Sequence, residues 1–193
     1  MGTPRQILST LRVRTLMSVR SESSGPFALG FPAFEHAKVV AVLRGRFDLQ
    51  IEGEAARTRL RRGDCYMLTS GRPYRISNAD VAETDAADLF SAHRGADGVV
   101  RWGDGRADTV TLGCRATLTA RSAALLRAGL APVIHIPADA PEAARIRAIL
   151  SLLLGEDDDA PDATLMGERY FGVLLVQALR HHLRDEPGPS RRG

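Results

Sequence analysis

The chain has 193 residues, of which 44% are hydrophobic and 25% charged, and its formal net charge is +3. This length allows one compact domain, or one domain with a helical appendage, and the composition is that of an ordinary globular protein. No apolar segment approaches membrane-spanning length and the arginine-rich start lacks the apolar core of a signal peptide, so we expect a cytoplasmic protein that does not enter membranes.

The positive charge comes almost entirely from arginine, because Lys38 is the only lysine. The arginines are scattered along the sequence, which favours solvated surface positions over a nucleic-acid-binding stripe. Cys65 and Cys114 lie far apart and have no metal-ligand spacing. We expect both cysteines to be reduced.

The first predicted elements are a helix over residues 4–16 and a strand that begins within residues 13–19. Thr3 could cap the helix, with Pro4 at its first position. A polar loop follows, and residues 27–31 are predicted to form the next strand.

Residues 38–78 carry the strongest strand signals. Phe47, Leu49 and Ile51 alternate with polar residues in the two-residue period of a half-buried strand. Turns at Gly45 and Gly63 divide this stretch into short strands. This pattern predicts a small closed all-β barrel or sandwich rather than an α/β fold.

The remaining elements change from strands to helices. We predict a loop over 78–88, short strands at 89–90 and 99–102, and a last clear strand over 109–118. Helices are then expected at 122–128, 141–154 and 162–183, with an extended segment at 132–137 and a linker-like tail over 187–193.

These elements predict a mainly β fold with α-helices, in which residues 1–118 form an N-terminal helix and barrel. Residues 119–184 form a helical subdomain that mediates dimerisation, and residues 185–193 form a linker. The last helix is apolar around most of its circumference, so it must be covered on two sides. Either a second copy covers one side, or the helix packs on the barrel and on its neighbour. The candidate dimer contacts are Tyr170, Val173, Leu174 and Gln177.

The barrel stretch resembles the cupin family. Gly63, Thr69, Gly71, Tyr74 and Asn78 have the spacing of the second cupin motif, in which proline normally stands at the position of Thr69 and a metal-binding histidine at that of Tyr74. The glutamate ligand of the first motif falls on Lys38, and its two histidines fall near Pro32 and Phe34. The resemblance therefore implies a cupin-like jelly-roll barrel whose metal ligands have been replaced, and we expect neither a metal nor another cofactor.

From about residue 6 to its end, the chain resembles the N-terminal effector-binding domain of AraC-type transcriptional regulators. The segments that carry this resemblance are 7–19, 25–29, 41–45, 60–68, 112–113, 130–137 and 174–180. In this family the last helix leads through a linker into two helix-turn-helix motifs. We expect the present sequence to end at that linker, either as an excised sensor domain or as a stand-alone relative.

A candidate ligand pocket follows from the barrel. His36, Lys38 and Val40 share one face of a strand. If this face points inward, a buried ammonium needs an anionic ligand or a carboxylate; alternatively, Lys38 lies at the rim and reaches water. Tyr74 either binds a ligand through its hydroxyl or fills the core. Further candidates for the lining are Phe47, Tyr66, Met67 and Arg72.

The resemblance implies a sensor that binds a small organic effector, forms a homodimer and contacts DNA only through a helix-turn-helix part absent here. The alternative is a stand-alone, metal-free cupin enzyme that uses Lys38, His36 or Tyr74 for acid–base chemistry on a biosynthetic intermediate. No residue pattern identifies a catalytic nucleophile or a metal site.

Overall fold

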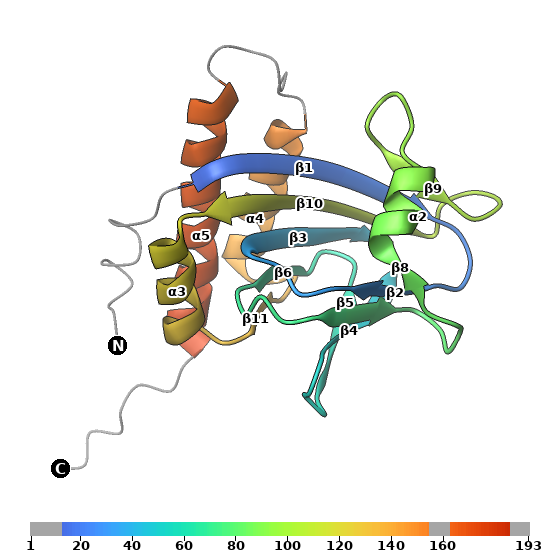
Figure 1. The fold of residues 1–193 in the computed structure, drawn as a ribbon, viewed down its shortest axis with the longest axis horizontal. Helices are drawn as coiled ribbons and strands as arrows, with labels where there is room; N and C mark the ends of the chain where they lie inside the picture. Colours follow the sequence, from blue (N-terminus) through green and yellow to red (C-terminus); the bar gives the residue numbers. More distant parts are fainter. Residues whose placement is uncertain (1–12, 155–162, 186–193) are drawn as a thin grey trace.

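The computed structural model describes residues 13–154 and 163–185 (Figure 1). The regular elements are β1 (Val13–Ser23), β2 (Ala28–Phe31), β3 (His36–Arg44), β4 (Arg46–Ile51), β5 (Arg57–Arg61), β6 (Cys65–Leu68), β7 (Tyr74–Ser77), β8 (Thr84–Asp85), α2 (Ala86–Ala92), β9 (Val100–Trp102), β10 (Thr109–Leu118), α3 (Ala120–Gly129), β11 (Val133–Ile136), α4 (Pro141–Leu153) and α5 (Ala163–Asp185). The predicted fold class, mainly β with helices after the barrel, is confirmed.

The strands form two sheets that face each other. The larger sheet has the order β11-β6-β3-β10-β1-β9, and the smaller has the order β5-β4-β7-β2-β8. At the centre of the larger sheet, β10 pairs antiparallel with both β1 and β3 along most of its length. These three long strands form one wall of the barrel, and the smaller sheet forms the opposite wall (Figure 1).

Strand alternation divides the side chains of the larger sheet between two apolar cores. On β3, Ala37, Val39 and Ala41 belong to the core beneath the helices. Val40 and Val42 belong to the core between the two sheets. Because successive side chains of a strand point to opposite faces, the even-numbered residues of β3 face the barrel interior, which decides the direction that the sequence left open.

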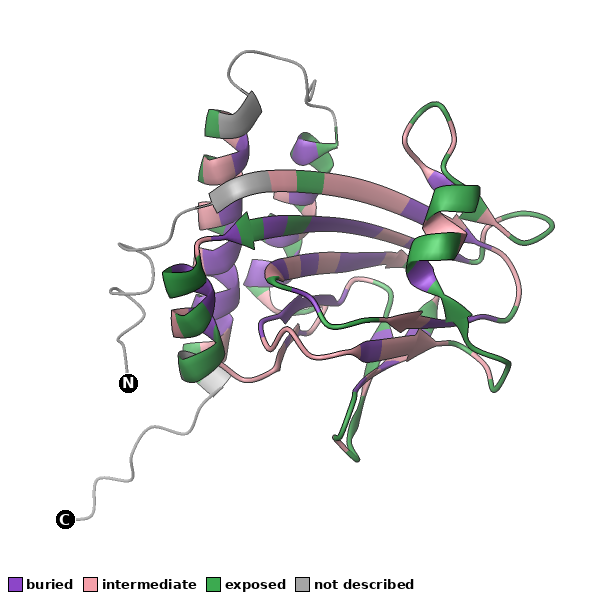
Figure 2. Cartoon of the chain, viewed as in Figure 1, coloured by how far each residue is buried: buried purple, intermediate pink, exposed green. Residues whose placement is uncertain are grey.

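The helices α3, α4 and α5 cover the outer face of the larger sheet (Figures 1 and 2). The buried residues of α5 in this layer are Phe171, Leu174, Leu175, Ala178 and Leu179. None of the helices in residues 13–154 and 163–185 combines the length and apolarity needed to cross a lipid bilayer.

This arrangement changes the set of candidate dimer contacts. Leu174 is 0% exposed and Gln177 is 6% exposed, so both side chains lie inside the protomer. Neither side chain is available for a contact between two copies, because the helix uses that face to cover its own sheet. Tyr170 is partly buried against the same core, whereas Val173 is 44% exposed.

Two further predictions about local structure change. The predicted helix over 4–16 falls mostly outside the described residues, and from Val13 onward the chain is strand β1. Residues 89–90, predicted as a strand, belong to α2, and β8 lies within the predicted loop. The side chain of Asp85 caps α2 by accepting hydrogen bonds from the backbone N–H groups of Ala87 and Asp88. This N-cap starts a helix where the short apolar pair alone indicated a strand.

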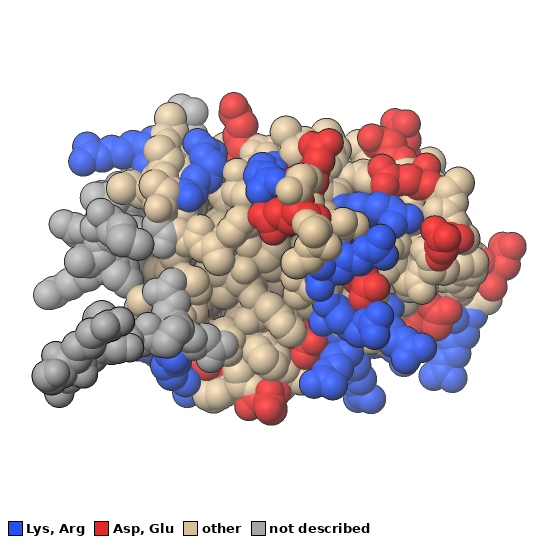
Figure 3. All heavy atoms as spheres, turned by 90° about the horizontal axis from the view of Figure 1, so that it is seen from below, with Lys and Arg blue, Asp and Glu red and all other residues tan. Residues whose placement is uncertain are grey.

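Exposed arginines gather along the free edge of the smaller sheet. Arg57, Arg59 and Arg61 alternate along the edge strand β5, and Arg46 lies opposite Arg61. Figure 3 shows the resulting group of basic side chains on the face seen from below, with acidic side chains among them. Charged residues on an edge strand oppose pairing with another chain, which gives these arginines a structural role.

Asp64 joins the barrel to the segment that leads into the helices. Its side chain is 1% exposed and accepts hydrogen bonds from the backbone N–H groups of Arg61 (3.1 Å) and Ala138 (2.9 Å). His135 Nε2 lies 3.1 Å from the same carboxylate, which gives this histidine a structural role. The turn requires Gly63, since its φ is 93° and a Cβ there would meet Ala138 at 2.7 Å.

Replacing Asp64 with alanine should destabilise the fold. We expect Asp64→Ala to lower the free energy of unfolding by about 2–4 kcal/mol, because buried backbone donors lose their acceptor. Urea denaturation measures this loss. The control is Asp48→Ala, which removes a surface ion pair with Arg59 and should cost less than about 1 kcal/mol. Equal losses in the two variants would contradict the anchoring role.

Candidate ligand-binding site

A cavity of about 460 Å³ lies between the two sheets and beneath α2. Its wall is largely aromatic, formed by Phe27, Phe31, Phe34, Phe47, Tyr66, Tyr74, Phe90 and Trp102. Four residues that can carry positive charge also line it: His36, Lys38, Arg94 and Arg115. Among the described residues, none that lines this cavity is Asp or Glu.

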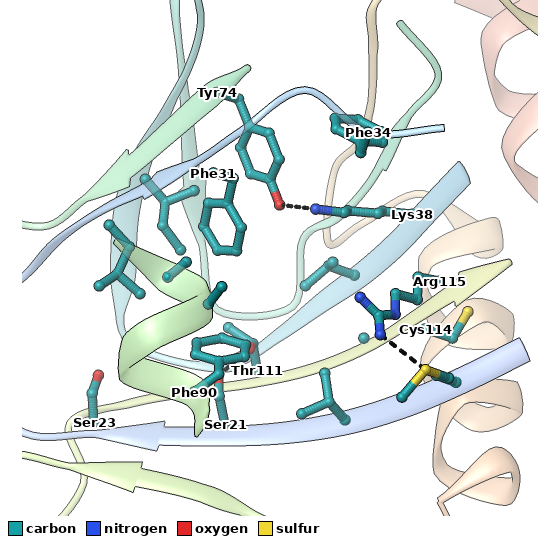
Figure 4. Close-up of a pocket in the computed structure, with 18 of the residues that line it drawn as sticks. Ser21, Ser23, Phe31, Phe34, Lys38, Tyr74, Phe90, Thr111, Cys114 and Arg115 are labelled. Carbon is teal, nitrogen blue, oxygen red and sulfur yellow. Dashed lines mark hydrogen bonds between the residues drawn. The ribbon is translucent and has the colours of Figure 1, made fainter. Parts of the chain in front are cut away.

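Lys38 spans the cavity from one sheet to the other (Figure 4). It projects from β3 of the larger sheet, and its Nζ donates a 2.8 Å hydrogen bond to the hydroxyl of Tyr74 on β7 of the smaller sheet. The same Nζ lies 4.8 Å from the ring centroid of Phe31, 4.5 Å from that of Phe34 and 4.6 Å from that of Tyr74. Three ring faces therefore surround the amine, an arrangement that attracts its charged form.

The rings around Lys38 also hold each other in place. Phe31 and Tyr74 are paired residues on β2 and β7, and their rings stack with centroids 4.4 Å apart. Phe34 meets the Tyr74 ring edge-on at 5.7 Å. These contacts restrict the Tyr74 hydroxyl to the side of the ring cluster that faces Lys38.

Burial lowers the pKa of Lys38 from 10.5 to about 7, and the positive charge of Arg115 acts in the same direction. Arg115 is the cross-strand partner of Lys38 on β10 and is exposed to solvent. Burial, followed by the charges of Lys38 and Arg115, also lowers the pKa of His36 to about 4, so its imidazole is neutral at pH 7. This end of the cavity thus holds a cation that is only partly stabilised by its surroundings.

Hydroxyl groups line the other part of the cavity. Ser21 Oγ and Thr111 Oγ1 lie 2.7 Å apart on paired positions of β1 and β10. Ser23, Thr109 and Trp102 complete this region, and Phe90 of α2 covers it (Figure 4).

The structure brings six of the eight candidate residues together on the cavity wall: His36, Lys38, Val40, Phe47, Tyr66 and Tyr74. Lys38 faces the interior and not the rim. That these residues bind a ligand stays a prediction.

Met67 and Arg72 do not belong to the cavity. Met67 follows Tyr66 on β6, so alternation directs it to the core beneath the helices. Arg72 lies in the β6–β7 connection, where Nη1 donates to Glu54 Oε1 at 2.8 Å and Nη2 donates to the Glu52 carbonyl. Its charge is therefore satisfied outside the barrel.

Several lining residues were not among the sequence candidates. The odd-numbered residues of β10, Thr109, Thr111, Gly113 and Arg115, were recoverable from strand alternation once one of them was known to face inward. Phe90 carried no such signal, because α2 was not predicted.

A family profile described as cupin matches residues 5–184. The chain belongs to the cupin family. The positions at which the family's motifs place metal ligands hold Lys38 and Tyr74, which are hydrogen-bonded to each other. An ammonium group does not coordinate a metal, and no three His, Cys, Asp or Glu residues in the described part of the chain are placed to share one. These residues do not fit the family's metal centre.

Two curated relatives are similar over nearly the whole chain. A putative AraC-like transcription regulator of Streptomyces lividans is 33% identical over 183 residues, which cover 94% of this chain and 59% of the relative. One from Streptomyces antibioticus is 32% identical over the same shares. The expected resemblance to AraC-type regulators is confirmed, and the chain spans less than two thirds of the length of these relatives.

Among solved structures, an apo ToxT variant from Vibrio cholerae has a TM-score of 0.49 and 8% identity, covering 88% of this chain and 58% of that one. The AraC-like transcriptional activator CuxR has a TM-score of 0.45 and 11% identity, covering 82% of this chain and 46% of that one.

The pKa of Lys38 can be measured directly. Because it is the only lysine, side-chain labelling with ¹⁵N-lysine gives a single NMR signal for its amine or ammonium nitrogen. We expect its titration midpoint in the ligand-free protein near pH 7, against 10.5 for a solvated lysine. A midpoint at the ordinary value would show that the amine is not desolvated.

Lys38 should also lower stability in the ligand-free state. Its folded pKa lies below the unfolded value, so the cost of burying the ammonium is full below about pH 7 and fades as the pH rises toward 10.5. We expect Lys38→Met to raise the free energy of unfolding by roughly 1–3 kcal/mol near pH 6, and by less near pH 9. Chemical denaturation at both pH values measures this, and a loss of stability at both would contradict the expectation.

Proposed function

We propose that this chain is the effector-sensing domain of an AraC-like transcription regulator, and that its effector is a small organic anion bound in the barrel. The observation that carries the anionic part is the partly buried Lys38 ammonium in a cavity whose described wall contains no carboxylate. The names of the two relatives support the regulatory part.

An acidic group placed beside Lys38 and Arg115 supplies the counter-charge that the protein wall lacks. It raises the pKa of Lys38 toward its ordinary value, since a nearby negative charge favours the ammonium form. The aromatic wall then takes the apolar body of the molecule. Binding is therefore coupled to protonation of Lys38.

The binding site and the helices share the same strands. The inward face of β3, β10 and β1 lines the cavity, and the outward face of these strands packs against α4 and α5. An effector that favours one position of Lys38 and its ring cluster can thereby favour one arrangement of the helices, provided that it binds the two arrangements with different affinity.

We further propose that the domain forms a homodimer in the cytoplasm and acts on DNA through a helix-turn-helix part outside this chain. Three apolar side chains recur on the exposed side of α5: Leu165 (51% exposed), Val173 (44%) and Leu183 (49%). A repeated apolar surface of this kind supports a contact between two copies.

The second candidate function is a metal-free enzyme. The observation that favours it is the 2.8 Å contact between a lysine of near-neutral pKa and a tyrosine hydroxyl, a pair able to exchange a proton with a substrate. A bound molecule recovered unchanged after long incubation supports the sensor, whereas its conversion supports the enzyme. Native mass spectrometry of the bound state distinguishes the two.

The anionic effector is tested with a panel of carboxylic acids, each compared with its primary amide. We expect acids that bind to raise the melting temperature and their neutral amides to have little effect. Lys38→Met should remove the response, whereas Arg72→Met, which deletes a cation outside the cavity, should keep it.

Affinity for a responding acid should fall as the pH rises above about 7, by at most about tenfold per pH unit, since the neutral amine gives no ion pair. Amides that bind as well as the acids would refute the anionic effector.

Dimerisation through α5 is tested by Val173→Glu. We expect light scattering after size-exclusion chromatography to give the mass of two copies for the parent chain and of one copy for the variant, because a charge in the contact opposes association. The matched control is Leu152→Glu, which changes a similarly exposed side chain (54%) on α4. A dimer that survives Val173→Glu would place the contact elsewhere.

A further inference from the structure

Two buried polar groups in the hydroxyl-lined part of the cavity have no hydrogen-bond partner. They are the hydroxyl of Ser23 and the indole N–H of Trp102. Ser23 is only 1% exposed, and both residues line the cavity. No partner for either atom occurs among residues 13–154 and 163–185. Because a buried donor that stays unpaired is costly, this pair indicates that a partner enters from the cavity.

The fold places these two groups together. Ser23 and Trp102 occupy paired positions of the parallel strands β1 and β9. The Trp102 ring is held edge-on by Phe27, with centroids 6.0 Å apart, and lies 6.1 Å from Phe90. The orientation of the indole is thus set by ring contacts. Its N–H can only donate, so the missing partner is a hydrogen-bond acceptor.

Other hydroxyls that line this end of the cavity do not share this feature. Ser21 Oγ pairs with Thr111 Oγ1 at 2.7 Å, and Thr109 Oγ1 donates to Asp108 Oδ1 at 3.1 Å. Among the described polar groups that line this end of the cavity, the unpaired ones are thus Ser23 Oγ and Trp102 Nε1, since Ser24 Oγ is buried without a partner but does not line the cavity.

The pair lies at the opposite end of the cavity from Lys38 (Figure 4). Strand register gives the separation: Ser23 pairs with Thr109 on β10, and Lys38 pairs with Arg115 on the same strand. At about 3.4 Å per residue, these two positions on β10 are roughly 20 Å apart. Aromatic and aliphatic side chains, together with the mutually paired hydroxyls of Ser21 and Thr111, line the space between them.

We propose that Ser23 and Trp102 form a second binding station, which holds an oxygen acceptor at the far end of the effector. This proposal rests on the proposed function and deepens it. The effector is then an elongated organic anion with an apolar middle, an acidic group at Lys38 and a hydroxyl, carbonyl or ether oxygen at the Ser23–Trp102 station. The two stations together select for length as well as charge.

The test uses straight-chain carboxylic acids of increasing length, each with and without a terminal hydroxyl. We expect the hydroxyl to tighten binding by about threefold to tenfold at the chain length that spans the two stations, and to weaken it or leave it unchanged at shorter lengths. Isothermal titration calorimetry on the full chain measures both members of each pair.

Variants assign the gain to the station. Trp102→Phe retains an aromatic ring and removes the N–H, and Ser23→Ala removes the hydroxyl, so each should reduce the gain, measured within each variant as the ratio of its affinities for the hydroxylated and the plain acid. The matched control is Ser24→Ala: Ser24 Oγ is also buried without a partner, but Ser24 does not line the cavity. The control should keep the full gain.

A measurement without substitution covers the case in which a variant fails to fold. Trp102 is the only tryptophan, so the protein has one indole N–H signal in NMR. This signal should move downfield with the hydroxylated acid and not with the plain acid.

The outcomes separate the two proposals. If acids bind but the hydroxyl gives no gain at any length, the anionic effector stands and the second station is overturned, with water as the partner of Ser23 and Trp102. If no acid of any length binds, both proposals are overturned.

Discussion

The hydrogen bond from Lys38 to Tyr74 crosses the barrel, and much of the site depends on it. It joins β3 of the larger sheet to β7 of the smaller one at 2.8 Å, inside a cluster of aromatic rings. Each partner would be costly to bury alone, because the hydroxyl needs a partner and the ammonium needs a charge or a ring face. Together they connect the two sheets across the cavity.

The same pair maintains a contact across the cupin barrel at two positions that differ from the family's metal-ligand pattern. In the cupin pattern these two positions carry metal ligands, which bind a cation from both sheets. Here a lysine on one sheet supplies the cation from within the chain, and a tyrosine on the other accepts its hydrogen bond. The cross-barrel link is kept, while coordination chemistry is replaced by a group whose charge depends on pH.

Much of this arrangement could be predicted from the sequence, because strand alternation is a local property. The alternation of Phe47, Leu49 and Ile51 gave the correct inward face of β4. His36, Lys38 and Val40 share the inward face of β3 for the same reason. The prediction that both Tyr66 and Met67 line the pocket is inconsistent with this alternation, since neighbouring residues on a strand cannot both face inward.

The remaining differences arise from tertiary contacts. Arg72 lies outside the pocket because it pairs with Glu54, which is 18 positions earlier in the sequence. No local sequence pattern predicts this contact. Leu174 and Gln177 are covered by the chain's own sheet, which the apolar circumference of the helix alone could not decide. Phe90 lines the site because the Asp85 N-cap favours helix α2 in a segment whose apolar pair, Leu89 and Phe90, alone predicts a strand.

The division of β10 between two faces separates the lining of the cavity from the contacts with the helices. Thr109, Thr111, Gly113 and Arg115 line the cavity, whereas Leu112, Ala116 and Leu118 belong to the core beneath the helices. Substitutions of the cavity-lining residues leave the residues that pack against the helices largely unchanged. The lining of the cavity can therefore change while the contacts with the helices are preserved. The odd positions of β1 and β10, together with the even positions of β3, could therefore be exchanged as one group to change the lining of the cavity while the contacts with the helices are kept.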